Sequence, residues 1–404
     1  MKYIIAVLIV LFASFADIFL FRIGIIPVQP SELLIPLFLV VCAVRYSILD
    51  MLDIFKSHTF RLFAAILFLS LVYSAKSPVS TDVIITEIVL CLFTLVMYVF
   101  LVHFFRTESK NLVFLVIFSS FAVLALSVYY DYFVGLPKFS ASLEAMVRKG
   151  GFGENPNQAA SAMKFLALCV LVYLQQNKAK RSLFIVVMVM SVFMTFSRSG
   201  IISIALILIL GTANSWSAKF KINPASLFKS SFKMVFLFAF LYVGLVFFAG
   251  ILKSEFPELA RGGMADRIDL LTGQSKGSII AEDSGTGGGG RGDLLLIFLD
   301  KFMKNPIGYG TAYTVGSSDS HLNTHNYYLY LAVNLGFLAL LFYLIYLFVG
   351  IQISFKSDQF YYLIFIALLM FEGLISHYIF YNRSMLICVA FFDSLIYKKV
   401  LNTA

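Results

Sequence analysis

Two arginines and two histidines lie next to apolar segments, and their side chains suit the chemistry of a phosphate-bearing substrate. Arg198 interrupts an apolar run in the string TFSRSG, and Arg291 follows a glycine tract at the start of an amphipathic stretch. A guanidinium group binds two phosphate oxygens at once, and a helix N-terminus adds backbone N–H donors. His325, with His321 four residues earlier, precedes another apolar run, where an imidazole can take a proton from a hydroxyl group. These residue types predict anion binding and hydroxyl activation.

Three of these residues also have a structural interpretation, which the sequence leaves open. An arginine inside a membrane costs about 2.5 to 3.5 kcal/mol unless it has a partner. An anionic ligand would supply that partner to Arg198, but the side chain can also reach the interface and anchor the segment there. Arg291 can equally be a solvated loop residue beside Asp293, and His325 an interfacial residue that caps a helix.

No metal and no cofactor are expected. His321 and His325 have the spacing of a helical metal pair, but no glutamate follows the first histidine and no cysteine lies nearby. The aspartates of the same region do not have metal-site spacing either. The glycine tract at 285–290 lacks the Lys-Ser/Thr pair of a nucleotide-binding loop.

The elements that carry these residues are expected to be membrane helices. The chain has 404 residues, of which 60% are hydrophobic and 13% charged, and its mean hydropathy is +0.90. A helical span needs about 20 apolar residues, and the runs are continuously apolar, unlike the alternating strands of a barrel. The sequence therefore predicts an all-α integral membrane protein with about twelve transmembrane helices. The apolar runs cover residues 3–22, 31–48, 60–74, 83–104, 112–130, 157–175, 182–196, 199–213, 231–252, 326–352, 360–378 and 384–397.

The distribution of positive charge predicts the topology. The run 182–213 would form a helix of about 48 Å, longer than a ~30 Å hydrocarbon core, so two short spans with Arg198 at their tip fit better. This division keeps the lysines near 178–180 and 219–229 on one side, and short cytoplasmic loops are rich in Lys and Arg. Both termini are therefore expected in the cytoplasm. The net charge of +9 reflects the same bias and does not indicate a nucleic-acid partner.

A single integral domain with one long external loop is expected. Residues 1–252 hold spans one to nine, residues 253–324 form the only long hydrophilic stretch, and residues 325–404 hold spans ten to twelve. The topology places this loop on the outer side of the membrane. Functional residues concentrate in such loops.

Four polar residues inside the apolar runs are expected to face the bundle interior, because exposure to lipid is costly. They are Asp17, Lys164, Glu372 and His377. Lys164 lies near the start of its run and can reach outward. Glu372 can be either a structural carboxylate or one that positions a substrate.

Four short segments lie at the ends of the expected spans or in the expected loop. They are GENPN at 153–157, FSRSG at 196–200, GRG at 290–292 with NPIGYG at 305–310, and His325–Asn326 with Gly336. In their order and topology, these segments make the chain resemble the bacterial O-antigen ligase and polymerase superfamily, whose members are polytopic glycan transferases. The last of the four is similar to a ligase signature of a histidine, a small polar residue, nine residues and a glycine. After this glycine the chain reads FLAL, without the second Gly and the Thr of many ligases.

The resemblance implies a donor glycan on undecaprenyl pyrophosphate and a site at the periplasmic face of the bacterial inner membrane. In this reading Arg198 and Arg291 bind the pyrophosphate and stabilise the charge that develops on it. His325 is the general base for the acceptor hydroxyl. The implied activity is that of a metal-independent, inverting glycosyltransferase. Supporting roles fall to His321, Asn326, Asn157 and Glu372.

The acceptor and the class of protein have alternatives. A ligase transfers the glycan to lipid A core, whereas a polymerase uses a second lipid-linked glycan; the spacing from His325 to Gly336 slightly favours the ligase. A polysaccharide transporter or flippase would also have many spans and polar residues such as Lys164 and Glu372 within them. Against a transporter, the spans show no two-fold repeat. A membrane O-acyltransferase, which would use a similar His-Asn pair, is a more distant alternative.

Overall fold

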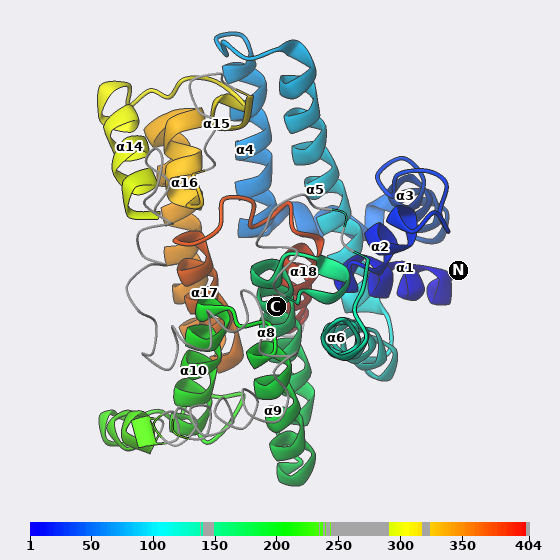
Figure 1. Cartoon of the computed structure of the whole chain (residues 1–404), viewed down its shortest axis with the longest axis vertical. Helices are drawn as coiled ribbons and strands as arrows, with labels where there is room; N and C mark the ends of the chain where they lie inside the picture. The colour runs from blue at the N-terminus through cyan, green and yellow to red at the C-terminus, as the bar shows by residue number, and fades with distance from the viewer. Residues whose placement is uncertain are drawn as a thin grey trace. The chain divides into compact units, whose positions relative to one another are not determined.

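The described part of the chain is all-helical, and several of its helices are as apolar as those of a membrane protein. The computed structural model describes residues 1–137, 139, 149–233, 235, 236, 239, 243, 291–316 and 324–400, and within these ranges every regular element is a helix (Figure 1). Four of the described helices are long and apolar enough to cross a membrane, or six if each of two bent pairs counts as one span. The four are α5 (Thr81–Thr107), α6 (Lys110–Phe133), α8 (Pro156–Leu174) and α16 (Tyr327–Lys356).

The two bent pairs occupy the first two apolar runs. Helices α1 (Lys2–Ser14) and α2 (Ala16–Arg22) meet at 77°, because Phe15 between them has a left-handed backbone with φ 60°. Helix α3 (Leu34–Arg45) and the 3-10 helix η1 (Ile48–Lys56) meet at 109°. Each of these runs is therefore a broken segment rather than a straight helix.

The run 182–213 is divided as the sequence suggested. Helix α9 (Lys178–Phe193) ends before the Arg198 string, and helix α10 (Arg198–Ala213) begins at Arg198. Most of the ninth expected run, 231–252, lies outside the described residues, as do residues 253–290 of the expected external loop. The described part of that loop holds α14 (Arg291–Lys304) and α15 (Tyr313–Gly316).

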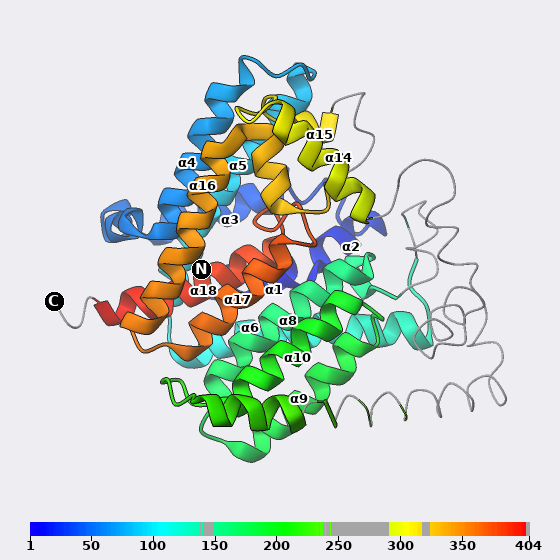
Figure 2. The ribbon, with the colours of Figure 1, turned by 90° about the vertical axis from the view of Figure 1, so that its left-hand side faces the viewer.

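By its internal contacts the chain divides into two compact units, residues 1–120 with 288–404 and residues 121–287. In the first unit, α5 packs against α4 (His58–Ser74) and α18 (Arg383–Val400), and α16 packs against α4 and α17 (Phe360–Gly373) (Figure 2). A buried ion pair between Arg383 and Asp17 ties α18 to α2. Asp17 thus faces the interior, as expected for a carboxylate in a membrane protein.

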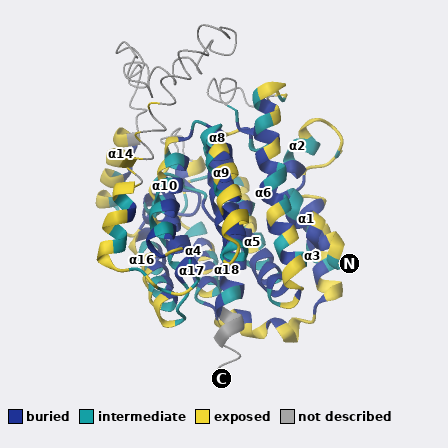
Figure 3. Ribbon diagram, turned by 90° about the horizontal axis from the view of Figure 1, so that it is seen from below, coloured by how far each residue is buried: buried dark blue, intermediate teal, exposed yellow. Residues whose placement is uncertain are grey.

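In the second unit, α8 packs against α9 and α10. Nearly all of α8 is buried, including Lys164, whose Nζ donates a hydrogen bond of 3.0 Å to Ser203 Oγ on α10. Lys164 therefore faces the interior, as expected for the polar residues of the apolar runs, and does not reach outward. Its hydroxyl partner offsets part of the cost of burying the polar head. Figure 3 shows how buried and exposed faces alternate around the helices.

Helix α16 is two arms that fold back at Gly336, which corrects the single span expected over 326–352. The backbone of Gly336 has φ 75° and ψ −176°, which is not helical. The rings of Tyr327 and Tyr343 lie only 4.9 Å apart, although 16 residues of straight helix would separate their backbones by about 24 Å. The first arm (residues 327–335) therefore runs antiparallel to the second arm (residues 337–356), and Figure 2 shows this turn beside α14.

Candidate functional site

Two segments that the sequence singled out separately form one backbone joint in the first unit. The NPIGYG segment, residues 305–310, binds the turn of α16 through three backbone hydrogen bonds. Tyr309 N donates to Val333 O at 2.8 Å, Gly310 N to Asn334 O at 3.0 Å, and Phe337 N to Pro306 O at 2.8 Å. These bonds satisfy groups that the break in the helix leaves without helical partners.

Glycine is required on both sides of this joint. A Cβ at Gly336 would overlap the carbonyl group of Ile307, and a Cβ at Gly308 would overlap the backbone nitrogen of Gly336. Both glycines also have positive φ, at 75° and 89°. Gly336, the glycine of the His-Asn pattern, is therefore needed because two backbones approach each other closely at this position.

The joint aligns α14 with the first arm of α16. Helix α14 leads directly into the segment that binds the turn, so the C-terminal ends of α14 and of the first arm lie together. Leu294 and Phe298 of α14 are buried in one cluster with Leu329 and Val333 of the first arm. Because the two helices run side by side in the same direction, their starts also share one end. The backbone of Arg291, which opens α14, and that of His325, which precedes the first arm, belong to that end.

His325 and Asn326 occupy the entry to the first arm. His325 is exposed and has a left-handed φ of 44°, which turns the chain before the helix begins. Asn326 is the N-cap residue, and its Oδ1 accepts a hydrogen bond of 3.0 Å from Leu329 N. Its amide also donates to Leu374 O at 3.5 Å, just beyond the end of α17. The entry to α16 is thereby held against the connection between α17 and α18.

That connection brings a second histidine to His325. Helix α17 ends at Gly373, so His377, expected inside the run 360–378, lies in the connecting segment instead. The His377 and His325 rings are perpendicular, with centroids 5.4 Å apart. Burial, together with the positive charge that His325 can carry, lowers the pKa of His377 to about 4. His377 is therefore neutral at pH 7, beside a more exposed imidazole.

Glu372 lies at the end of α17, one turn before His377. It is buried, and its backbone carbonyl accepts hydrogen bonds from the N–H groups of Ile375 and Ser376 at 3.0 and 2.9 Å. The structure thus brings Glu372, Asn326 and His325 into the same region of the first unit, around the end of α17.

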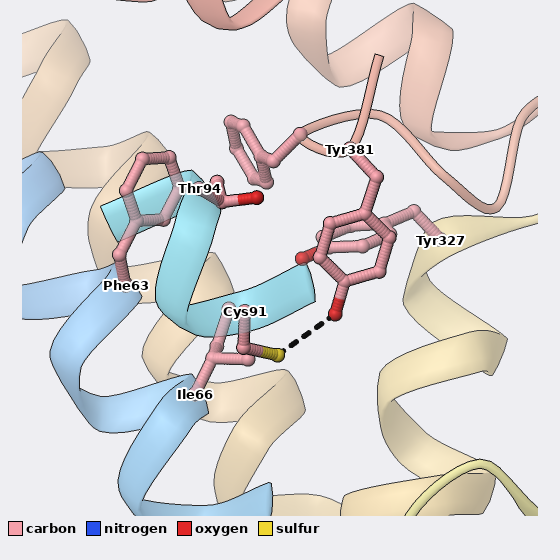
Figure 4. Close-up of a pocket in the computed structure, with 7 residues that line it drawn as sticks. Phe63, Ile66, Cys91, Thr94, Tyr327 and Tyr381 are labelled. Atoms are coloured by element: carbon pink, nitrogen blue, oxygen red, sulfur yellow. Dashed lines mark hydrogen bonds between the residues drawn. The ribbon is translucent and has the colours of Figure 1, made fainter. Parts of the chain in front are cut away.

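Sequence reasoning missed Glu87 and the tyrosines around it. Glu87 of α5 is buried, and its carboxylate accepts a hydrogen bond from the hydroxyl of Tyr330 on the first arm. Tyr381 contacts Cys91 Sγ through its hydroxyl at 2.9 Å, beside a small pocket shown in Figure 4. Ring contacts continue from Tyr330 to Tyr378 and from there to His377, with centroids 5.6 and 4.2 Å apart. The sequence signal that could have identified Glu87 is its position as a carboxylate inside the apolar run 83–104.

The second unit contains Arg198, the other arginine expected to bind the pyrophosphate. Ser197 is the N-cap residue of α10, and its Oγ accepts a hydrogen bond of 3.3 Å from Gly200 N. The same hydroxyl donates to Asn157 Oδ1 at 3.0 Å, which brings Asn157 of α8 to the start of α10. Arg198 is the first residue of α10 and is exposed. An exposed guanidinium at a helix start suits an anion.

The expected site residues thus fall into two sets. Arg198 and Asn157 belong to the second unit, whereas Arg291, His325, Asn326 and Glu372 belong to the first. His321 lies outside the described residues. Within the described ranges no cluster of three or more His, Cys, Asp or Glu side chains could hold a metal ion.

Comparison with known families places a match on the central part of the chain. Residues 183–344 match the family described as O-Antigen ligase. The matched region contains Arg198, Arg291, His325 and Gly336, while Asn157 and Glu372 lie outside it. The match confirms the resemblance to the O-antigen ligase and polymerase superfamily. Comparisons with curated proteins and with solved structures gave no match. Together with the apolar helices, the family match indicates a bacterial membrane protein.

Proposed function

From the O-antigen ligase match over residues 183–344, we propose that the protein is a glycosyltransferase that moves a glycan from undecaprenyl pyrophosphate to a sugar hydroxyl. The observation that carries the proposal is the joint between the NPIGYG segment and Gly336, which aligns α14 with the first arm of α16. As a result, the backbones of Arg291 and His325, two residues of the matched region, lie at the same end of this helix pair. The ligase activity, with lipid A core as acceptor, is our first choice.

The proposed setting is the bacterial inner membrane. The chain has about twelve spans, with both termini in the cytoplasm and residues 253–324 on the periplasmic side. The bundle consists of residues 1–252 and 325–404, and the site opens to the periplasm. The lysine-rich connections at 178–180 and 219–229 support this orientation.

The proposed mechanism is a direct displacement at the anomeric carbon. His325 takes the proton of the acceptor hydroxyl while the oxygen forms a bond to that carbon. The bond from the carbon to the pyrophosphate oxygen breaks, and its electron pair leaves with the pyrophosphate. Arg198 and Arg291 stabilise this charge, which calls for no metal ion. Attack from the face opposite the leaving group inverts the anomeric configuration.

The remaining polar residues have positioning roles in this scheme. Asn326 fixes the entry to α16 and thus the direction of His325, and neutral His377 supports the imidazole without competing for its proton. Asn157 holds Ser197 at the start of α10, behind Arg198. Glu372 and His321 complete the polar surroundings of the acceptor.

A polymerase of the same superfamily is the second candidate, because FLAL after Gly336 departs from the ligase pattern. A gel profile of lipopolysaccharide from a deletion strain separates the two. Bare core with polymer accumulating on the lipid carrier indicates a ligase, and core with a single repeat indicates a polymerase. An unchanged profile would refute both and favour a transporter.

Complementation of that strain tests the residues. Arg291→Lys keeps the charge but loses the two-pronged geometry, so we expect most activity to disappear while protein abundance stays normal. His325→Ala should also be inactive, since general base catalysis contributes about 10² to 10⁴-fold. Arg22→Lys, an exposed arginine at the end of α2, is the matched control and should be fully active. Full activity of Arg291→Lys would show that the two-pronged geometry of Arg291 is not needed.

A further inference from the structure

Helix α14 has an apolar face that no other described residue covers. The helix falls in the stretch expected to be a hydrophilic loop, yet its sequence is RGDLLLIFLDKFMK. Leu294 and Phe298 form its buried face against the first arm of α16. Figure 3 nevertheless shows much of α14 as exposed.

Five apolar side chains of α14 are exposed. At about 100° per residue, four of them occupy one arc of about 100°, which we call the outer stripe, and the fifth, Ile297, is 38% exposed and lies about 100° beyond that arc. All four are apolar and exposed, and Leu296 and Met303 have the largest exposed fractions, 63% and 69%. The outer stripe consists of Leu295, Leu296, Leu299 and Met303.

A narrow polar edge borders the outer stripe. Asp293, Asp300 and Lys304 fall within an arc of about 40° on the helix. All three are exposed, and Lys304 Nζ lies 2.6 Å from Asp300 Oδ2. The outer face of a helix in water carries charged and polar residues, whereas a wide apolar arc beside a polar edge is typical of a helix that lies in a membrane interface.

The outer stripe is continuous with the surface of a candidate span. Ile307, which follows α14, is 68% exposed, and its neighbour Pro306 accepts the hydrogen bond from Phe337 N. Phe337 and Leu338 are exposed at the start of the second arm of α16, which belongs to a helix apolar enough to cross a membrane. Exposed apolar side chains therefore lie on both segments that meet at the joint, α14 with Ile307 and the second arm of α16.

We propose that α14 is an interfacial helix whose outer stripe inserts into one leaflet of the bilayer, with the polar edge facing water. Leaving four large apolar side chains in water forfeits the burial free energy, about 25 cal/mol for each Å² of apolar surface. Acyl chains cover them without a protein partner. This assignment concerns the membrane and does not depend on the glycosyltransferase activity.

Fluorescence quenching in proteoliposomes tests the proposal. Leu296→Cys and Met303→Cys are labelled with an environment-sensitive fluorophore in phosphatidylcholine vesicles, and Lys304→Cys on the polar edge is the matched control. The four native cysteines are buried, so the unsubstituted chain gives the background. We expect nitroxide groups on acyl chains to quench the Leu296 and Met303 labels severalfold more than the Lys304 label, and aqueous iodide to show the reverse order.

Three results would overturn the proposal. Quenching of all three labels by iodide alone would place the outer stripe in water. Equal lipid quenching at all three positions would remove the one-sided orientation. Protection of the Leu296 and Met303 labels from both quenchers would mean that a protein surface covers the stripe. A lipid-soluble carbene reagent provides the same test on the unsubstituted chain, where the peptide holding residues 295–303 should be labelled.

Discussion

Gly336→Ala tests whether the turn of α16 depends on a conformation that only glycine adopts. The backbone of Gly336 combines φ 75° with ψ −176°, a region that is essentially restricted to glycine. A Cβ here would also overlap the carbonyl group of Ile307, so the backbones of α16 and the NPIGYG segment would have to separate.

The expected cost follows from these two effects. Holding alanine in this backbone region costs about 1 to 3 kcal/mol. Separation of the backbones breaks the three hydrogen bonds made by Tyr309, Gly310 and Phe337, each worth about 0.5 to 1.5 kcal/mol. The total is about 3 to 7 kcal/mol, a large part of the 5 to 15 kcal/mol that stabilises a typical protein. The corresponding fall in Tm is on the order of 10 °C.

Thermal unfolding of the purified protein in detergent measures this cost. Gly350→Ala is the matched control, because Gly350 lies in the second arm of the same helix and the atoms nearest to its Cβ would belong to the Ile366 side chain, with Cδ1 at 2.7 Å and Cγ1 at 3.1 Å. The end of that side chain can move, so the control should keep its Tm within a few degrees and retain activity. Gly336→Ala should lose both. Equal Tm values for the two variants, with activity preserved, would refute the role of the joint.

Two further predictions concern the entry to α16. Because burial lowers the pKa of His377 to about 4 from an unfolded value near 6.5, the folded protein binds fewer protons than the unfolded chain between these values. The free energy of unfolding should fall as the pH is lowered from about 6.5 to about 4, by at most about 3 kcal/mol. The Tm of His377→Phe should fall less than that of the unsubstituted protein over this pH range, and equal falls in the two Tm values would contradict the prediction. Asn326→Ala loses the helix cap and should cost about 1 kcal/mol, whereas Asn326→Asp keeps the acceptor for Leu329 N and should retain more stability and activity. Equal effects of the two substitutions on Tm and on polymer transfer would remove the cap from the explanation.

The helical elements followed closely from hydropathy. Most of the expected apolar runs coincide with a helix, and the division of 182–213 into α9 and α10 follows from the thickness of a bilayer. The FSRSG string could also be interpreted locally, since Ser197 is a typical N-cap residue before a helix. These features depend on short-range rules, and a single sequence is enough to apply them.

The turn at Gly336 could not be found in this way. The sequence around it is as apolar as an unbroken span, and one glycine is tolerated within a membrane helix. The break becomes favourable only because residues 305–310 supply backbone partners from a distant part of the chain. The same limit applies to Glu87 and to His377, whose neighbours come from other helices.

The interval from His325 to Gly336 acquires a physical meaning from this turn. The joint holds one end of the first arm, and the bond from Asn326 to Leu374 O holds the other. The nine residues between, 327–335, rise about 14 Å, so their number determines where the imidazole of His325 meets that of His377. One inserted residue would turn His325 by about 100° around the arm and separate the two rings. One glycine is enough for the turn, because Phe337 contributes an ordinary N–H to the joint. The spacing of the motif therefore determines the distance between the turn at Gly336 and His325, the proposed base.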